Sequence, residues 1–261
     1  MNTQTGIALL GSAVVWLLLE RRKDSRRLSA RVLRPGVRID LTFVVLGYLL
    51  LTLPTLYYVR VATEGFNAAF GSRLQSVALP LSIRVLVAVV LLDLGGYFVH
   101  RLLHRVGPLW EFHKVHHSSP MLDWLATFRS HLVEQVFRRA FTPLLLFALG
   151  MSMDAIVLGS AVIVGWAMFG HANIGWSLRP LEWVLITPRL HHLHHVPATS
   201  QKNFAVVFSC WDRWMGTLAT QTAPADCVLG VPDEVTTYPT RFFDLLREPF
   251  SRLVSRNERS P

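Results

Sequence analysis

The chain of 261 residues has little cysteine and no motif for an organic redox cofactor. Its two cysteines, Cys210 and Cys227, form neither a CxxC pair nor a spaced framework, which excludes a disulfide scaffold, a zinc knuckle and a cysteine-ligated iron–sulfur cluster. No GxGxxG loop follows a strand pattern, and the Glu-x-x-His pair of carboxylate-bridged di-iron bundles is also missing. Any metal must therefore be held by other ligands, and electrons must come from a separate protein.

Acidic residues are also scarce, and the apolar fraction is high. The net charge is +9, 51% of the residues are hydrophobic, and the mean hydropathy is +0.36. The basic residues lie beside long apolar runs, where they indicate membrane topology and contact with anionic lipid better than they indicate nucleic-acid binding. The composition therefore predicts a membrane protein with no nucleic-acid partner.

The first apolar run, residues 6–19, has no basic residue before it and a dense basic cluster after it. The cluster comprises Arg21, Arg22, Lys23, Arg26, Arg27, Arg31, Arg34 and Arg38. A cleaved signal peptide carries its charge in front, so this pattern predicts a retained spanning helix. By the positive-inside rule the cluster is cytoplasmic and the N-terminus lies outside.

Three further apolar runs follow. Residues 41–59 contain Pro54, which predicts a kink. Residues 78–99 cross back, with Arg84 near the outer end, so His100 emerges on the cytoplasmic side. Residues 141–170 are too long for one span and are interrupted at GMSMD, which predicts a helical hairpin whose second arm Ser152 caps.

The expected fold is an all-α integral membrane protein, with about four transmembrane helices or hairpin arms and a cytoplasmic histidine-rich helical cap. We expect three regions: N-terminal membrane helices with a basic loop (1–77), a catalytic domain (78–220) and a C-terminal cytoplasmic tail (221–261). The tail from Arg241 onward is polar and basic, and its very end is expected to be disordered.

All eleven histidines fall between residues 100 and 195. Three motifs, HRLLH, HKVHH and HHLHH, have the spacing of one helix face, so each is expected to direct its ring nitrogens one way. Leaving out His192, the candidates are His100, His104, His113, His116, His117, His131, His171, His191, His194 and His195. Ten are too many for one four-coordinate zinc and suit two metals. Imidazole binds iron, copper, nickel and zinc, so the ligand type leaves the metal open.

Other polar residues are candidates to orient these ligands, because a metal-bound imidazole donates its second N–H to an acceptor. Asp93 lies on one helical stripe with Tyr97, His100 and His104, and an acid in a spanning helix is a functional candidate. The alternative is that Asp93 is a structural partner for Arg84 or for a backbone group. The remaining candidates are Glu111, Asp123, Glu134, Asn173, Glu182, His192 and Asp212.

The ordered motifs HRLLH, HKVHHSS, RSHLVE, GHANI, TPRLHHLHH and WDRWMGT, from Leu91 to Leu218, resemble the fatty acid hydroxylase superfamily, also called the sterol desaturase family. The resemblance implies a membrane oxidoreductase with two non-haem irons held by the ten histidines. It implies O₂ as co-substrate, and hydroxylation or desaturation through hydrogen abstraction from an acyl or sterol carbon. It implies no catalytic residue separate from the ligands. Leu132 replaces a proline that many relatives have, and His192 fills a position usually held by another residue.

The same resemblance implies a membrane lipid as substrate and a separate ferredoxin or cytochrome as reductant, since the chain has no fused cytochrome b5 module. Two other classes stay open. One is a membrane zinc transporter or sensor, and the other is a bis-histidine haem protein for electron transfer. No residue selects the lipid, the carbon attacked, hydroxylation over desaturation, or an oligomeric state.

Overall fold

The computed structural model describes residues 14–16, 18–20, 34, 36–70, 79–176, 178–221 and 228–257. The regular elements in these ranges are helices, and the only strand-like feature among them is an isolated antiparallel bridge between Leu185 and Phe208. The prediction of an all-α fold is therefore confirmed.

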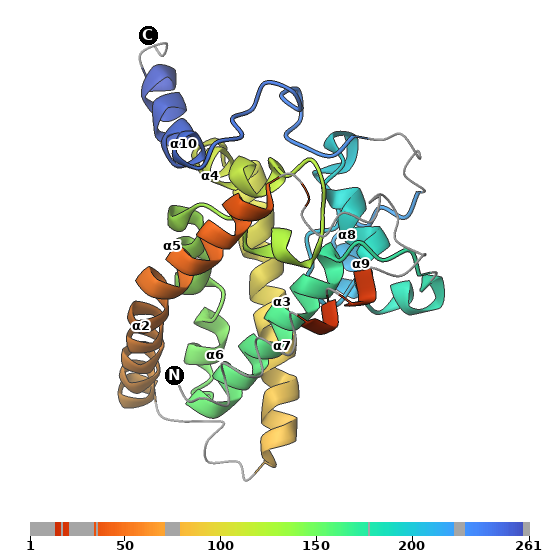
Figure 1. The fold of residues 1–261 in the computed structure, drawn as a ribbon. Coiled ribbons are helices and arrows are strands. Elements are labelled where there is room, and N and C mark those ends of the chain that lie inside the picture. The colour runs from red at the N-terminus through yellow and green to blue at the C-terminus, as the bar shows by residue number, and fades with distance from the viewer. Residues whose placement is uncertain are drawn as a thin grey trace.

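Three helices in the described part of the chain are long and apolar enough to cross a membrane: α2 (Val37–Phe70), α3 (Leu81–Arg105) and α7 (Met153–His171). They extend from the lower end of the molecule toward the remaining helices (Figure 1). Helix α2 continues through Pro54 and exposes Leu53 (75%) and Tyr57 (71%), as expected for a surface facing lipid. Of the first apolar run, only residues 14–16 and 18–19 are described, and both stretches are helical. The predicted span at residues 6–19 therefore lies mostly outside the described residues. Residues 21–33, which carry most of the basic cluster, also lie outside them.

The stretch 141–170 breaks where the sequence predicts, at Leu149–Ser152, where Gly150 has a φ of 66°. Its first arm is not one span, because α5 (Leu132–Phe141) is followed by the five-residue α6 (Leu144–Ala148). Ser152 stands at the N-cap position of α7, but its hydroxyl does not cap the helix. Instead it accepts a hydrogen bond from the Arg84 guanidinium at 2.6 Å, which ties the start of α3 to the start of α7.

Helices α3 and α7 pack closely. A Cβ on Gly159 would lie 2.9 Å from the Ala88 Cβ, so only glycine lets the two backbones approach this far. The apolar core beside them includes Leu92, Phe147 and Ile156. This core fixes the upper ends of α3 and α7, which carry three of the histidines, relative to each other.

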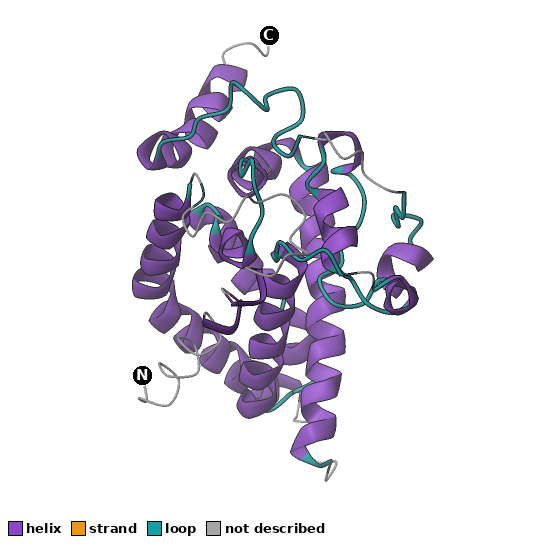
Figure 2. Cartoon of the chain, turned by 45° about the vertical axis from the view of Figure 1, so that its right-hand side comes forward, coloured by secondary structure: helices purple, strands orange, loops and turns teal. Residues whose placement is uncertain are grey.

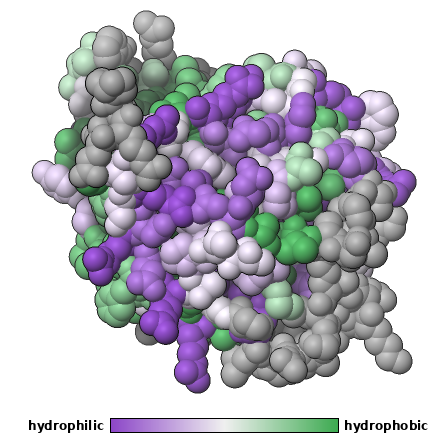
Figure 3. Space-filling view, turned by 90° about the horizontal axis from the view of Figure 1, so that it is seen from above, coloured by the Kyte–Doolittle hydropathy of each residue, from purple (hydrophilic) through white to green (hydrophobic). Residues whose placement is uncertain are grey.

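The other elements form a cap at the end of the spans: α4 (Gly107–His117), η1 (Trp124–Phe128), η2 (Arg179–Trp183), α8 (Pro188–His194), η3 (Pro197–Thr199), α9 (Cys210–Trp214) and α10 (Phe242–Asn257). Figure 2 shows helices joined by loops above and beside the upper half of the long helices. Seen from above, hydrophilic side chains dominate the described part of this face (Figure 3). The predicted tail is helical in α10, and its last residues, 258–261, lie outside the described ranges.

Candidate metal centre

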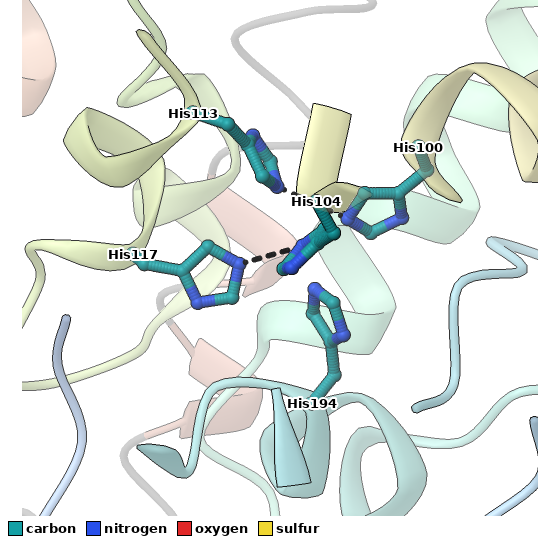
Figure 4. Close-up of side chains that lie close together, drawn as sticks. All are labelled: His100, His104, His113, His117 and His194. Atoms are coloured by element: carbon teal, nitrogen blue, oxygen red, sulfur yellow. Dashed lines mark hydrogen bonds between the residues drawn. The ribbon is translucent and has the colours of Figure 1, made fainter. Parts of the chain in front are cut away.

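Nine of the ten predicted ligands converge in two buried groups. In each group, one candidate ligand atom per residue lies within 4.8 Å of all the others. The five-histidine group, drawn in Figure 4, contains His100, His104, His113, His117 and His194. The four-histidine group contains His116, His171, His191 and His195. The chain thus offers two adjacent all-nitrogen sites, supplied by α3, α4, α7 and α8 with the residue that follows α8.

Each HxxHH motif divides its histidines between the two groups, and this corrects the expectation that one motif directs all its rings one way. On α4, His113 and His117 enter the five-histidine group, and His116 enters the other. At α8 the pattern is reversed, because His191 and His195 share the four-histidine group and His194 joins the five-histidine group. Neighbouring residues on a helix point about 100° apart, so adjacent histidines enter different groups.

Local helix signals place these short helices. Helix α4 begins after Val106, with a proline in its first turn, and α8 begins at Pro188. Proline is favoured at these positions because its fixed φ suits the first turn and its missing N–H has no intrahelical acceptor there. Thr187 caps α8 by accepting a hydrogen bond from the Leu190 N–H. These signals fix where the two helices begin, and the start of each helix sets which of its residues face inward.

Five of the nine imidazoles are oriented by an oxygen atom at Nδ1. The Nδ1–acceptor distances are 2.7 Å for His100 and the Phe204 carbonyl, 2.8 Å for His113 and Glu134, 3.0 Å for His116 and the Arg129 carbonyl, 2.8 Å for His171 and the Ala167 carbonyl, and 2.7 Å for His194 and the Lys202 carbonyl. A carbonyl oxygen can only accept, so Nδ1 carries the proton and Nε2 is left with its lone pair. This is the arrangement of metal-binding histidines.

These tautomers test whether the groups fit a metal. His100 and His113 both hold their proton on Nδ1, yet their Nε2 atoms lie 3.2 Å apart. His116 and His171 repeat this pattern at 3.3 Å. Two neutral imidazoles with facing lone pairs cannot hydrogen-bond to each other, whereas two ligands each about 2.1 Å from one cation lie about 3.0 to 3.4 Å apart. The residues therefore fit two metal ions.

Burial keeps the rings neutral. Loss of hydration lowers the pKa of His113, and it lowers that of His194 to about 3. The same cause holds four further pKa values well below the usual value, those of His116, His117, His191 and His195. The nearby histidines add to this effect at His116, because a charge on one ring opposes a charge on the next. Neutral imidazole is the form that binds metal.

His131 is not brought to either group. It is the N-cap of α5, where its Nδ1 accepts a hydrogen bond from the Val133 N–H at 3.1 Å and its Nε2 donates to the Leu246 carbonyl at 3.2 Å. Both ring nitrogens are thus engaged elsewhere. His192 is buried and donates from Nε2 to the carbonyl of the ligand candidate His171 at 3.1 Å.

Asp93 holds a loop beside the metal centre. Its carboxylate accepts hydrogen bonds from the backbone N–H groups of Val206, Val207 and Phe208 and from the Trp211 indole, at 2.7 to 3.0 Å. The structural alternative, a backbone partner, is therefore the contact observed. Asp212 accepts from the N–H groups of Phe204 and Ala205 at 2.8 and 2.9 Å. Together the two acids fix the segment whose Phe204 carbonyl orients His100.

Of the other polar candidates, one hydrogen-bonds directly to a histidine of the two groups and the rest have other partners. Glu134 contacts His113 directly and also accepts from Arg138 at 2.7 Å. Although burial opposes its charge, His113 and the Arg138 guanidinium hold the pKa of Glu134 well below its usual range. The backbone N–H of Asn173 donates to Glu20. The remaining three, Glu111, Asp123 and Glu182, pair with Lys114, Arg34 and Arg189 rather than with a ligand.

Two contributions are not found by sequence reasoning. One is a buried ion network in which Asp40 pairs with Arg34 and Arg129, and Asp123 pairs with Arg34. The Arg129 carbonyl is the acceptor for His116, so this network reaches the four-histidine group. The other is Trp110, whose ring centroid lies 4.8 Å from that of His104 and 5.4 Å from that of His117. Asp123 and Arg34 are visible in the sequence, but their pairing with each other and with Asp40 and Arg129 carries no sequence signal.

Comparisons with known proteins agree with this geometry. The family model for fatty acid hydroxylases matches residues 85–217. Ornithine lipid hydroxylase OlsE of Rhizobium tropici is 31% identical over 175 residues, which cover 66% of this chain and 52% of that protein. Alkylglycerol monooxygenase of Xenopus tropicalis is 31% identical over 127 residues (48% and 28%). Human cholesterol 25-hydroxylase is 31% identical over 150 residues (54% and 53%).

The matched parts cover about half the length of these relatives or less. The family match contains all nine histidines of the two groups and also Asp93, Glu134 and Asp212. No solved structure matches the chain.

Proposed function

The chain belongs to the fatty acid hydroxylase family, and we propose that it is a membrane lipid hydroxylase that uses O₂ and two non-haem irons held by histidine. The observation that carries the proposal is the pair of adjacent buried groups in which neutral imidazoles turn their Nε2 lone pairs toward one another. Family membership favours iron among the metals that imidazole binds. The nine histidines of the two groups are the proposed ligands, without His131.

Bound iron supplies the activation of O₂ that breaking an unactivated C–H bond requires, which acid–base side chains cannot provide. The protein fixes the ligands and keeps water out. Trp110 and Phe204 pack against His104 at centroid distances of 4.8 and 5.2 Å, which closes one side of the five-histidine group. Glu134 is the one acid among the described residues that hydrogen-bonds a ligand ring, so it balances part of the metal charge there.

Hydroxylation is favoured over desaturation, because the named relatives are hydroxylases and monooxygenases. Their names refer to different lipids, so we propose a lipid substrate without choosing among acyl, ether and sterol chains. The same names leave the zinc transporter or sensor without support. Electrons come from a separate ferredoxin or cytochrome-type protein.

We propose that the cap lies in the cytoplasm and the N-terminus outside. Helices α3 and α10 carry arginines at this end, including Arg101, Arg105, Arg247 and Arg256. An excess of basic residues beside spans is typical of the cytoplasmic side.

The first test is a metal count on protein purified anaerobically in detergent from iron-supplemented cells. We expect two irons per chain, one for each group. His104→Ala should reduce the count, while His131→Asn should leave it unchanged, because asparagine can replace the N-cap of α5. Zinc alone, with no activity restored by ferrous iron and reductant, would contradict the proposal and favour the zinc transporter or sensor instead.

The second test identifies the reaction. Lipids of a strain lacking the protein are compared with those of the strain complemented by the parent chain or by His104→Ala. We expect a lipid that is heavier by one oxygen with the parent chain only. A loss of two hydrogens instead would indicate desaturation, and no mass change under aerobic growth would count against an oxygenase.

A further inference from the structure

A second surface stands apart from the metal centre, on η2 and α9. Five large apolar side chains gather there, each exposed by 42 to 71%: Leu181, Trp183, Val184, Trp214 and Met215. We call them the η2–α9 patch. A group of exposed large apolar side chains on neighbouring segments is typical of a surface that contacts another apolar body.

Backbone pairing holds the two halves of the patch together. Leu185 and Phe208 form the one antiparallel bridge among the described residues, and the Ser209 N–H donates to the Val184 carbonyl at 3.0 Å. The Arg213 guanidinium lies 4.4 Å from the centre of the Trp183 ring. Residues about 30 positions apart in the sequence therefore lie side by side.

Contacts with the spans fix the depth of this surface. The Trp166 indole on α7 donates to the Ile186 carbonyl at 2.9 Å, and Trp166 precedes His171 by five residues. Asp93 on α3 binds the Val206–Phe208 backbone, and it precedes His100 by seven residues. At 1.5 Å per residue, these contacts lie about 7 to 10 Å from the histidines toward the apolar part of the spans. In Figure 1 the short teal helix near residue 180, at the right of the view, lies at the height of the middle of α3 and lower than α4.

The charges around the patch have one sign. Within residues 179–184 and 210–216, the two acids are Glu182 and Asp212, and both are buried. Glu182 pairs with Arg189, and Asp212 accepts backbone hydrogen bonds. The exposed charged residues in these ranges are Arg179 and Arg213. A surface of tryptophan, aliphatic side chains and arginine complements anionic head groups above an acyl layer.

We propose that the η2–α9 patch is embedded in the membrane interface, with lipid as its occupant. Trp183 and Trp214 then lie at the level where head groups meet acyl chains, and the two arginines reach the head groups. The patch anchors the cap against the bilayer independently of the three spans. The segments that carry it lead directly to His191 and come directly from Phe204, so the anchor also fixes the height of the metal centre above the lipid.

The test measures depth with a fluorophore. Trp183 and Trp214 are replaced one at a time by cysteine in a full chain carrying Cys210→Ala and Cys227→Ala, and each cysteine is labelled with a nitrobenzoxadiazole dye. The variants are reconstituted into vesicles of phosphatidylcholine and phosphatidylglycerol. Leu53→Cys, on the exposed face of α2, is the control for the acyl region, and Val235→Cys, in the cap, is the aqueous control. All variants must elute with the parent chain from a sizing column.

Lipid carrying a nitroxide near the start of its acyl chain should quench the dye at positions 183 and 214 to at least the extent seen at position 53. Iodide in the water should quench the dye at position 235 but not at these two. Quenching by iodide without quenching by the lipid nitroxide would overturn the proposal. Protection from both quenchers would also overturn it, because the patch would then be covered by protein, such as a second copy of the chain.

Discussion

At the scale of the residue, the partner of Nδ1 decides what each imidazole can do. Rings that donate to a carbonyl or carboxylate have Nε2 available for metal, as His100 and His113 do. His131 shows the opposite case, because its Nδ1 accepts a backbone N–H. His131 therefore serves as the N-cap of α5 and lies outside both histidine groups.

Glu134 gives the sharpest prediction at this scale. Glu134→Gln keeps an oxygen near His113 Nδ1 but removes the negative charge that supports the ring as a ligand. Losing such a partner weakens metal binding by about 10- to 100-fold. We expect the affinity for cobalt, measured by titration and absorbance, to fall by this factor at the five-histidine group and to stay unchanged at the four-histidine group. Glu111→Gln is the matched control, since Glu111 lies on α4 with His113 but pairs with Lys114. Equal titrations for the two variants would show that the charge of Glu134 has no part in binding.

Protonation of the rings gives a pH dependence. Burial lowers the pKa of His116, His117, His191 and His195 in the folded chain, while the unfolded value is about 6.5. As the pH falls through 6.5, the unfolded chain takes up protons and the folded chain does not, so stability is lost on the acid side. The free energy of unfolding of metal-free protein in detergent should therefore fall by up to about 1.4 kcal/mol per histidine for each pH unit below 6.5. We expect this loss as a lower Tm at about pH 5.5 than at about pH 7.5. A Tm at about pH 5.5 that equals or exceeds the Tm at about pH 7.5 would mean that the rings are solvated or charged in the folded chain.

Sequence reasoning at this scale succeeds where spacing is local. The separations in HRLLH, HKVHH and HHLHH identify eight of the nine residues that the fold brings together, and the ninth, His171, is a single histidine in GHANI. It fails where the partner is a backbone atom, because the carbonyls of Phe204, Arg129 and Lys202 carry no side-chain signal. For His131 a signal does exist: Glu134 follows three residues later, which is the spacing of a capping box.

At the scale of the element, the start of α2 is tied to the metal centre through charge. Asp40 in the first turn of α2 pairs with Arg129, whose carbonyl orients His116. Asp40→Asn leaves two buried guanidinium groups without that partner, a change that costs about 3 to 5 kcal/mol. We expect a lower Tm, together with weaker cobalt binding in the four-histidine group than in the five-histidine group.

The control for Asp40 lies on the same helix. Glu64 pairs with Arg60 in an exposed contact at 2.8 Å, so Glu64→Gln should change stability by less than about 1 kcal/mol. If Asp40→Asn lowers the Tm but weakens both histidine groups equally, the network stabilises the fold without orienting His116 in particular.

Element boundaries show why the fold was only partly predictable. The apolar runs at 41–59 and 78–99 predict two spans, and α2 and α3 are found there. Both helices continue past the C-terminal ends of these runs, to Phe70 and Arg105. The extension of α3 carries His100 and His104, and polar residues there are buried by the cap instead of ending the helix. In 141–170, hydropathy could not distinguish a span from α6, which is apolar because it packs in the core beside Phe66 and Ala155.

At the scale of the whole molecule, the histidine groups join the cap to the spans. Four helices meet there, with α3 and α7 from the spans and α4 and α8 from the cap. Because neighbouring histidines on α4 and α8 belong to different groups, each group contains residues of both the spans and the cap. Metal should therefore stabilise the entire fold and not one loop.

Removing the metal tests this directly. A ligand that binds only the folded chain stabilises it by about 2.7 kcal/mol when present at 100 times its Kd. Ferrous or cobalt ions added anaerobically to chelator-treated protein should raise the Tm in a single cooperative transition. His194→Ala, which removes one ring of the five-histidine group, should reduce this rise. His131→Asn should retain it in full. Two separate transitions, or a rise equal in His194→Ala and the parent chain, would mean that metal is bound elsewhere or does not couple the cap to the spans.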